Sequence, residues 1–209
     1  MGVNRGYTVT TGLWARAVLQ HQYGVDLSKI TWVLSGDEHV AEYRPPANVE
    51  PIKVGRDMVQ MVLSGELVGA IGVQIDSPIV KPLIPHAAEA GYNALSDHGH
   101  YPINHLIVVK DEVLAAYPEL GPALFKAFAE SKRRYVDQLR SGSLAKPTEV
   151  DKMHQRVMAI TGADPLPYGL EPNSAMLQTC IRAAVAQGII DHAPALQSLF
   201  PANTHALTA

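Results

Sequence analysis

The stretch Tyr101-Pro-Ile-Asn-His-Leu-Ile-Val-Val109 separates two parts of the chain that differ in character. Before it, short apolar runs alternate with helical patterns and turn glycines, whereas helical periodicity dominates after it. Its last four residues, 106–109, are all apolar and include two valines, which predicts a strand buried on both faces. No second strand is predicted after it, although its backbone N–H and C=O groups need partners. We expect those partners in the first half of the chain, in another chain, or outside this sequence.

Composition limits the classes of function that fit. The chain has 209 residues, of which 47% are hydrophobic and 18% charged, an ordinary balance for one large domain or two small lobes. The net charge of −3 argues against a nucleic-acid partner. No apolar run approaches the roughly 20 residues that span a bilayer, so no membrane insertion is expected. The single cysteine, Cys180, excludes an internal disulfide and fits a reducing compartment. We expect a cytoplasmic protein, or a periplasmic one if a signal peptide precedes this sequence.

The first hundred residues alternate between strand and helix patterns. Strands are predicted at 1–4, 30–34 and 68–73, and helices at about 8–23 and 56–64. The threonines at 8, 10 and 11 offer N-cap hydroxyls for the first helix. Its predicted inner face consists of Leu13, Trp14, Ala17, Val18 and His21. This order predicts a small α/β lobe with a parallel sheet.

The remaining sequence predicts helices with short connections. They span about 87–97, 111–117, 119–140, 148–162, 174–187 and 194–200. Thr148 and Asp151 have the spacing of a capping box. The second half is therefore expected to be mainly helical.

Ligands of parallel sheets bind at the carboxyl ends of the strands, where three segments are expected to meet: 5–11, 35–44 and 74–77. The first segment also begins a helix, whose free N–H groups and dipole favour an anion. A well-capped helix with no ligand would have the same sequence. The second segment places Asp37, Glu38, His39 and Arg44 close together, which indicates either a solvated loop or a polar site.

Histidines gather before the central stretch. Asp97, His98, His100 and His105 match no zinc spacing, and we expect neither a metal nor a cofactor. His98 and His100 are predicted to be solvated. His105 directly precedes the predicted buried strand, which suits either a satisfied core residue or a proton donor.

Several blocks of the sequence together carry a family resemblance. They are Arg5-Gly-Tyr-Thr-Val-Thr-Thr-Gly-Leu-Trp-Ala-Arg16, Tyr23-Gly-Val-Asp-Leu27, Ile30-Thr-Trp-Val33, Pro102-Ile-Asn-His-Leu-Ile-Val-Val109 and Pro167-Tyr-Gly-Leu-Glu-Pro-Asn173. In these blocks the chain resembles the 4,5-dihydroxyphthalate decarboxylase family, whose fold is similar to type II periplasmic binding proteins. The resemblance implies two α/β lobes with a ligand between them. It also implies that residues 1–100 form the complete inserted lobe. Residues 101–209 would be the returning, mainly helical part of an incomplete second lobe, because family chains begin with another half-lobe.

This resemblance implies non-oxidative decarboxylation of a hydroxylated aromatic carboxylate. Such a ligand needs cations and N–H donors, and loss of CO2 needs a general acid beside the ring. The chemistry favours His105 and His39 as acids, with Asp37 or Glu38 to polarise them. The predicted ligand-binding residues are Arg5, Tyr7, Thr8, Thr10, Thr11, Arg44 and Asn104.

Two other functions fit the same pattern. Many members of the family are labelled as substrate-binding components of ABC transporters, so a non-catalytic protein that binds a small anionic solute is the main alternative. A folded but inactive fragment is the other. If the sequence truly begins at Met1, the unpaired strand at 106–109 predicts a homodimer.

Overall fold

The computed structural model describes all 209 residues and divides into two compact units. The first unit contains residues 1–85 and 179–193, and the second contains residues 86–178 and 194–209. The first unit thus includes a C-terminal segment that a division of the sequence at residue 100 leaves out. That these units correspond to the two lobes of a binding protein stays a prediction.

The first unit is built on a four-stranded sheet in which every pairing is parallel. Its elements are β1 (Gly2–Val3), α1 (Thr10–Tyr23), the 3-10 turn η1 (Leu27–Lys29), β2 (Trp32–Leu34), β3 (Val49–Pro51), α2 (Met58–Leu63) and β4 (Ala70–Ile71). The strands follow the order β3-β2-β1-β4, so the N-terminal strand lies inside the sheet. The expected α/β class with a parallel sheet is confirmed.

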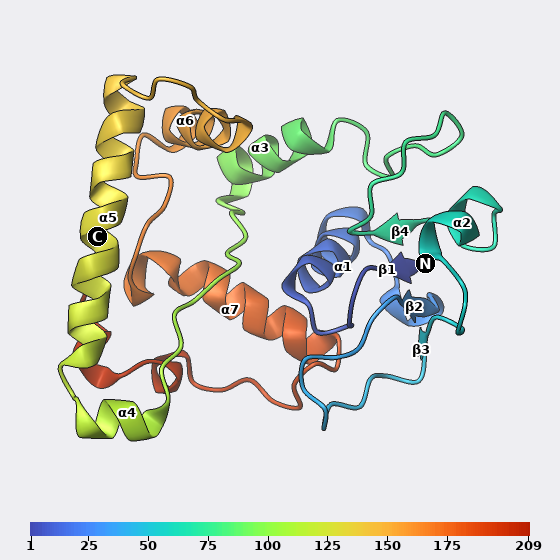
Figure 1. Ribbon diagram of the computed structural model, residues 1–209, viewed down its shortest axis with the longest axis horizontal. Helices are drawn as coiled ribbons and strands as arrows, with labels where there is room; N and C mark the ends of the chain where they lie inside the picture. The colour runs from blue at the N-terminus through green and yellow to red at the C-terminus, as the bar shows by residue number, and fades with distance from the viewer. The chain divides into compact units, whose positions relative to one another are not determined.

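Side chains alternate between the two faces of the sheet and give the unit three layers. Trp32 and Leu34 of β2 pack with Val3 and with Leu19 of α1. Val33, between them in sequence, packs on the opposite face with Met58 and Met61 of α2. In Figure 1, α1 and α2 accordingly flank the strands. The period-2 alternation of a strand therefore gives each helix its own apolar core.

The start of α1 differs from the prediction. Its N-cap is Val9, which makes no side-chain cap, and Thr10 and Thr11 lie inside the first turn. The Thr8 hydroxyl bonds instead to a carboxylate of another loop. The helix ends as predicted at Gly24, whose φ of 64° lies in the left-handed region. His21, predicted on the inner face, is exposed, and Arg16 is buried in the helix instead.

One strand was not predicted. β3 is only three residues long and pairs with β2 at the edge of the sheet. Its sequence Val49-Glu50-Pro51 lacks an apolar run, and Pro51 is tolerated because an edge strand leaves one side unpaired.

The second unit is mainly helical, as expected. It contains α3 (Ala87–His98), α4 (Asp111–Ala116), α5 (Leu120–Ser141), α6 (Glu149–Thr161), the first part of α7 (Leu170–Ala186), η2 (Leu196–Leu199) and η3 (Ala202–Thr204). α6 packs against both α3 and α5, as Figure 1 shows. The predicted capping box of α6 is confirmed, since the Thr148 and Asp151 side chains each bond to the other's backbone N–H.

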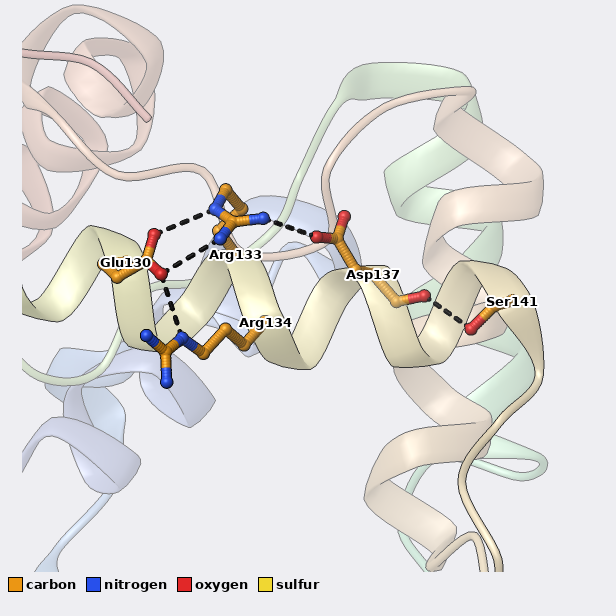
Figure 2. Close-up of polar contacts among 5 residues, drawn as sticks. All are labelled: Glu130, Arg133, Arg134, Asp137 and Ser141. Carbon is orange, nitrogen blue, oxygen red and sulfur yellow. Dashed lines mark hydrogen bonds and ion pairs between the residues drawn. The ribbon is translucent and has the colours of Figure 1, made fainter.

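The exposed face of α5 carries a chain of ion pairs (Figure 2). Glu130 accepts hydrogen bonds from Arg133 and Arg134, and Arg133 also contacts Asp137 at 2.9 Å. The bonds from the two guanidinium groups lower the pKa of Glu130 to about 2. All these side chains are well exposed, so water and salt screen the pairs. They support a solvated helix face rather than a site.

A partly buried polar group joins α5 to α6. The Tyr135 hydroxyl donates to Asp151 Oδ1 at 2.5 Å and lies 2.9 Å from His154 Nδ1. His154 is buried, and burial lowers its pKa below the usual value although Asp151 and Asp164 act in the opposite direction. Close by, Lys132 pairs with Asp164 at 2.6 Å.

We expect this group to make the second unit less stable in mild acid. A His whose pKa is lowered by folding binds its proton more readily in the unfolded chain. The free energy of unfolding should therefore fall as pH drops below about 6.5. The slope from this one proton is at most about 1.4 kcal/mol per pH unit. Urea unfolding at pH 7.5 and 5.5 measures it, and His154→Phe should flatten the difference. An unchanged difference in that variant would contradict the prediction.

The stretch 106–109 is not a strand in this chain. It has no regular secondary structure, and Leu106, Ile107 and Val108 are 57%, 61% and 90% exposed. The prediction of a strand buried on both faces is therefore wrong for the chain by itself. The reason is physical: an apolar run becomes a strand only where a neighbouring strand accepts and donates its backbone hydrogen bonds.

Pairing of this stretch by a second copy of the chain stays a prediction. We expect the protein to form a dimer, because an exposed apolar segment with free backbone groups is a template for strand addition. Val108→Lys should raise the dissociation constant of the dimer by about tenfold or more, the effect of burying one uncompensated charge. Light scattering after gel filtration measures this, with Val54→Lys, at another fully exposed valine, as the control. A monodisperse wild-type monomer would rule the dimer out.

Candidate functional site

The loops after β1 and β2 meet at the carboxyl edge of the sheet in the first unit. The Arg5 backbone N–H donates to Ser35 Oγ at 2.9 Å, and that hydroxyl donates to Asn4 Oδ1 at 3.1 Å. The Asn4 amide in turn donates to the carbonyl of Gly72, directly after β4. The structure thus brings together the ends of three strands, as expected for a parallel sheet.

Backbone geometry in the first loop is specialised. Arg5 has a φ of 67°, a left-handed conformation that is uncommon for a residue with a side chain. At the next position, a Cβ on Gly6 would lie 2.6 Å from Glu38 Oε2 and 2.9 Å from the Asp37 carbonyl. Only glycine therefore lets the two loops approach this closely.

A carboxylate already lies at the turn that leads into α1. Glu38 accepts hydrogen bonds from the backbone N–H groups of Tyr7 and Thr8, and from the Thr8 hydroxyl at 2.7 Å. We call this arrangement of two N–H groups and one hydroxyl the Tyr7–Thr8 cradle. Consecutive N–H groups that converge on one point form an anion-binding concavity. The predicted anion position at this turn is therefore occupied by the protein's own carboxylate.

A buried cation lies against the same turn. Arg16 is 0% exposed and stacks over the Tyr7 ring, with Cζ 3.7 Å from the ring centroid. Its Nη2 donates to the Tyr7 carbonyl at 2.6 Å, and its Nε donates to Gln187 Oε1 at 2.8 Å. Gln187 is itself buried and bonds through its amide nitrogen to the carbonyl of Leu13. Desolvation lowers the pKa of Arg16 to about 10, which still leaves it charged at neutral pH.

Two phenols complete the surroundings of Arg16. Burial raises the pKa of Tyr7 above its usual value and that of Tyr43 to about 12, where Glu38 also acts in the same direction. The Tyr43 hydroxyl donates to the carbonyl of Gly188 at 3.2 Å. Both phenols therefore stay protonated at neutral pH.

Most of the other predicted site residues of the first unit are exposed to solvent. Asp37 and His39 are exposed on the loop after β2. Arg44 is exposed as well, and its Nη1 donates to the carbonyls of Ala41 and Tyr43 in its own loop. Thr10 and Thr11 lie in the first turn of α1. The Arg5 side chain is exposed.

Asn104 and His105 belong to the second unit. Both side chains are exposed, on a segment without regular secondary structure. His105 therefore does not precede a buried strand, and the interpretation as a satisfied core residue is wrong. Its role as a proton donor stays a prediction.

Three residues around the cradle were not predicted: Arg16, Tyr43 and Gln187. The sequence held one signal for them. Arg16 interrupts an apolar helical run from Leu13 to Leu19, and a charge inside such a run suggests a buried, functional group. Gln187 carried no such signal, because its bond to Arg16 joins residues 171 positions apart.

Neither a metal centre nor a membrane span is found. No group of three or more His, Cys, Asp or Glu side chains is arranged to hold a metal ion. None of the helices combines the length and the apolar character needed to cross a bilayer.

Comparison with known proteins shows a distant relationship. No protein-family model matches the chain. The chain is similar to 4,5-dihydroxyphthalate decarboxylase of Comamonas testosteroni, with 26% identity over 204 residues. The similarity covers 88% of this chain but only 60% of the length of that relative. It supports a relationship to such decarboxylases at the level of a related family.

Proposed function

We propose that the chain takes part in removing CO2 from a hydroxylated aromatic carboxylate of the 4,5-dihydroxyphthalate type. The observation that carries this proposal is the similarity to a 4,5-dihydroxyphthalate decarboxylase along most of the chain. The Tyr7–Thr8 cradle and the cations near it add support, because they suit a ligand with carboxylate groups. We also infer a two-lobed fold of the type II periplasmic-binding-protein kind, with residues 1–100 as one lobe and 101–209 as part of the other.

The proposed reaction replaces a ring-to-carboxylate bond by a ring-to-hydrogen bond. A general acid donates a proton to the ring carbon that bears the carboxylate, and the carbon–carbon bond then breaks to release CO2. Each hydroxyl of 4,5-dihydroxyphthalate is para to one carboxylate and stabilises the positive charge that protonation places on the ring. The products are 3,4-dihydroxybenzoate and CO2, and no external electrons are needed.

The roles proposed for individual residues follow from this chemistry. His105 or His39 donates the proton. Asp37 is the better candidate to polarise a histidine, since both Glu38 oxygens are already bonded to Tyr7 and Thr8. Arg5 and Arg44 attract the dianion, Thr10 and Thr11 offer first-turn N–H groups, and Asn104 offers an amide.

The direct test is to incubate the 209-residue chain with 4,5-dihydroxyphthalate and to measure CO2 and 3,4-dihydroxybenzoate. Phthalate is the matched control, because it has both carboxylates but no hydroxyl para to either. We expect turnover of the first compound and none of the second. Binding of 4,5-dihydroxyphthalate without CO2 release would overturn the enzymatic proposal and leave a solute-binding function.

Replacing Arg5 is expected to weaken binding of the dianion. Its side chain is exposed beside the cradle, and a charge-assisted hydrogen bond contributes roughly 1.5–3 kcal/mol, or about tenfold or more in affinity. Arg5→Asn is the suitable variant, because asparagine tolerates a positive φ. Arg44→Ala should have a smaller effect, since that guanidinium already bonds to two carbonyls. Calorimetric titration with 4,5-dihydroxyphthalate measures both, and equal affinity for Arg5→Asn and wild type would contradict the prediction.

A further inference from the structure

The guanidinium of Arg16 is a buried cation that makes no salt bridge, although the Glu38 carboxylate acts on it from the neighbouring turn. None of the ion pairs of the chain includes Arg16. Its Nη1 is buried and has no hydrogen-bond partner. That nitrogen lies in the first turn of α1, where a Cβ on Gly12 would be 2.9 Å from it. Buried charges are normally paired because leaving one unpaired costs several kcal/mol.

The first turn of α1 adds a second source of positive potential. The N–H groups of Thr10, Thr11 and Gly12 have no acceptor within the helix, and the helix dipole is positive at this end. An unpaired guanidinium therefore lies against a helix end that itself attracts anions. Both features raise the positive potential around the turn that leads into α1.

A single peptide group links Arg16 to the cradle. Arg16 Nη2 bonds to the Tyr7 carbonyl, and the N–H of the same peptide, on Thr8, donates to Glu38 at 3.1 Å. A cation on the carbonyl polarises the peptide and makes its N–H a stronger donor. Arg16 thereby strengthens the cradle for a carboxylate without contacting the carboxylate of Glu38 directly.

We propose that the Tyr7–Thr8 cradle, charged by Arg16, is the subsite for one carboxylate of the ligand, and that Glu38 occupies it until the ligand displaces it. This inference rests on the proposed function for the chemical class of its ligand. Glu38 is half-buried on the loop between β2 and β3, and its hydrogen bonds to the cradle all end on its carboxylate oxygens, so a rotation of that side chain would free the three donors. The ligand's carboxylate takes over the same three donors and replaces Glu38 as the anion held on the peptide that Arg16 polarises.

Calorimetric titration of the full 209-residue chain with phthalate tests the exchange through two opposite effects. Glu38→Gln removes the competing charge and should tighten phthalate binding by about tenfold. Arg16→Met removes the cation and should weaken it by about tenfold or more. Glu42→Gln is the control for the first variant, as an exposed acid on the same loop, and Arg182→Met, at an exposed arginine, is the control for the second. Neither control should change the affinity by more than about twofold.

The two variants should change the phthalate affinity in opposite directions. If Glu38 and Arg16 had only a structural role, both variants would bind phthalate more weakly. Equal or weaker binding by Glu38→Gln, or no phthalate binding by the wild type, would overturn the inference. If Arg16→Met does not fold, the Glu38→Gln result decides by itself. If phthalate binds more tightly to Glu38→Gln and more weakly to Arg16→Met, but 4,5-dihydroxyphthalate releases no CO2, only the proposed function is contradicted. If Arg16→Met releases CO2 as fast as the wild type, only the present inference is contradicted.

Discussion

Replacing His105 by glutamine is expected to abolish CO2 release from 4,5-dihydroxyphthalate while leaving its binding unchanged. A positioned general acid contributes about 10²–10⁴ in rate, and glutamine cannot donate a proton to a ring carbon. The side chain is exposed on an irregular segment, so the substitution should change the free energy of unfolding by less than about 0.5 kcal/mol. Loss of activity in this variant would therefore report on chemistry rather than on folding.

The measurement separates kcat from the dissociation constant. CO2 release gives the first, and calorimetric titration gives the second. His98→Gln is the matched control, because His98 is also exposed and lies near the end of α3. His39→Gln tests the other candidate acid in the same assay. Full activity of His105→Gln, with activity lost in His39→Gln, would transfer the role to the loop after β2.

Much of the fold could be predicted because the relevant signals are local. Glycines at positions 24 and 142 end α1 and α5 in the left-handed conformation, and Thr148 with Asp151 caps α6. Such signals act over three or four residues and depend little on the rest of the molecule. The short apolar runs at β1, β2 and β4 likewise indicated a parallel sheet.

The failures share one physical cause, which is that tertiary partners are invisible in a local pattern. The apolar residues 106–109 have the composition of a strand but no neighbour in this chain to pair with. Thr8 was expected to cap α1, yet its hydroxyl finds a stronger acceptor in the carboxylate of Glu38, 30 residues away.

The candidate site was predictable by region and not by role. The convergence of the loops after β1 and β2 follows from parallel topology, and the structure shows it through Arg5 and Ser35. Parallel topology does not predict which side chains of these loops and of α1 are buried. Arg16 and Gln187 meet only because the chain returns to the first unit after residue 178. Asp37 or Glu38 was expected to polarise a histidine, and Glu38 bonds to backbone N–H groups in the turn before α1.

Replacing Trp32 by alanine is expected to destabilise the first unit by about 3–5 kcal/mol, the usual cost of deleting a buried large aromatic side chain. Trp32 is 0% exposed on β2, which lies between β1 and β3, and it packs with Val3 and Leu19. The loss combines the buried apolar area with the cavity that remains. Because the whole stability of a domain is about 5–15 kcal/mol, this one change should bring the first unit close to unfolding.

Trp32→Phe separates the aromatic core from the polar atom of the indole. The Nε1 of Trp32 is buried without a hydrogen-bond partner, so phenylalanine removes an unsatisfied donor while it keeps most of the apolar volume. We expect this variant to lose clearly less stability than Trp32→Ala, because the phenyl ring leaves a smaller cavity. Urea unfolding followed by circular dichroism measures both variants without relying on the fluorescence of the residue removed. Equal losses of stability in the two variants would contradict this prediction. The stability of the first unit would then not come from the packing of the Trp32 ring against α1.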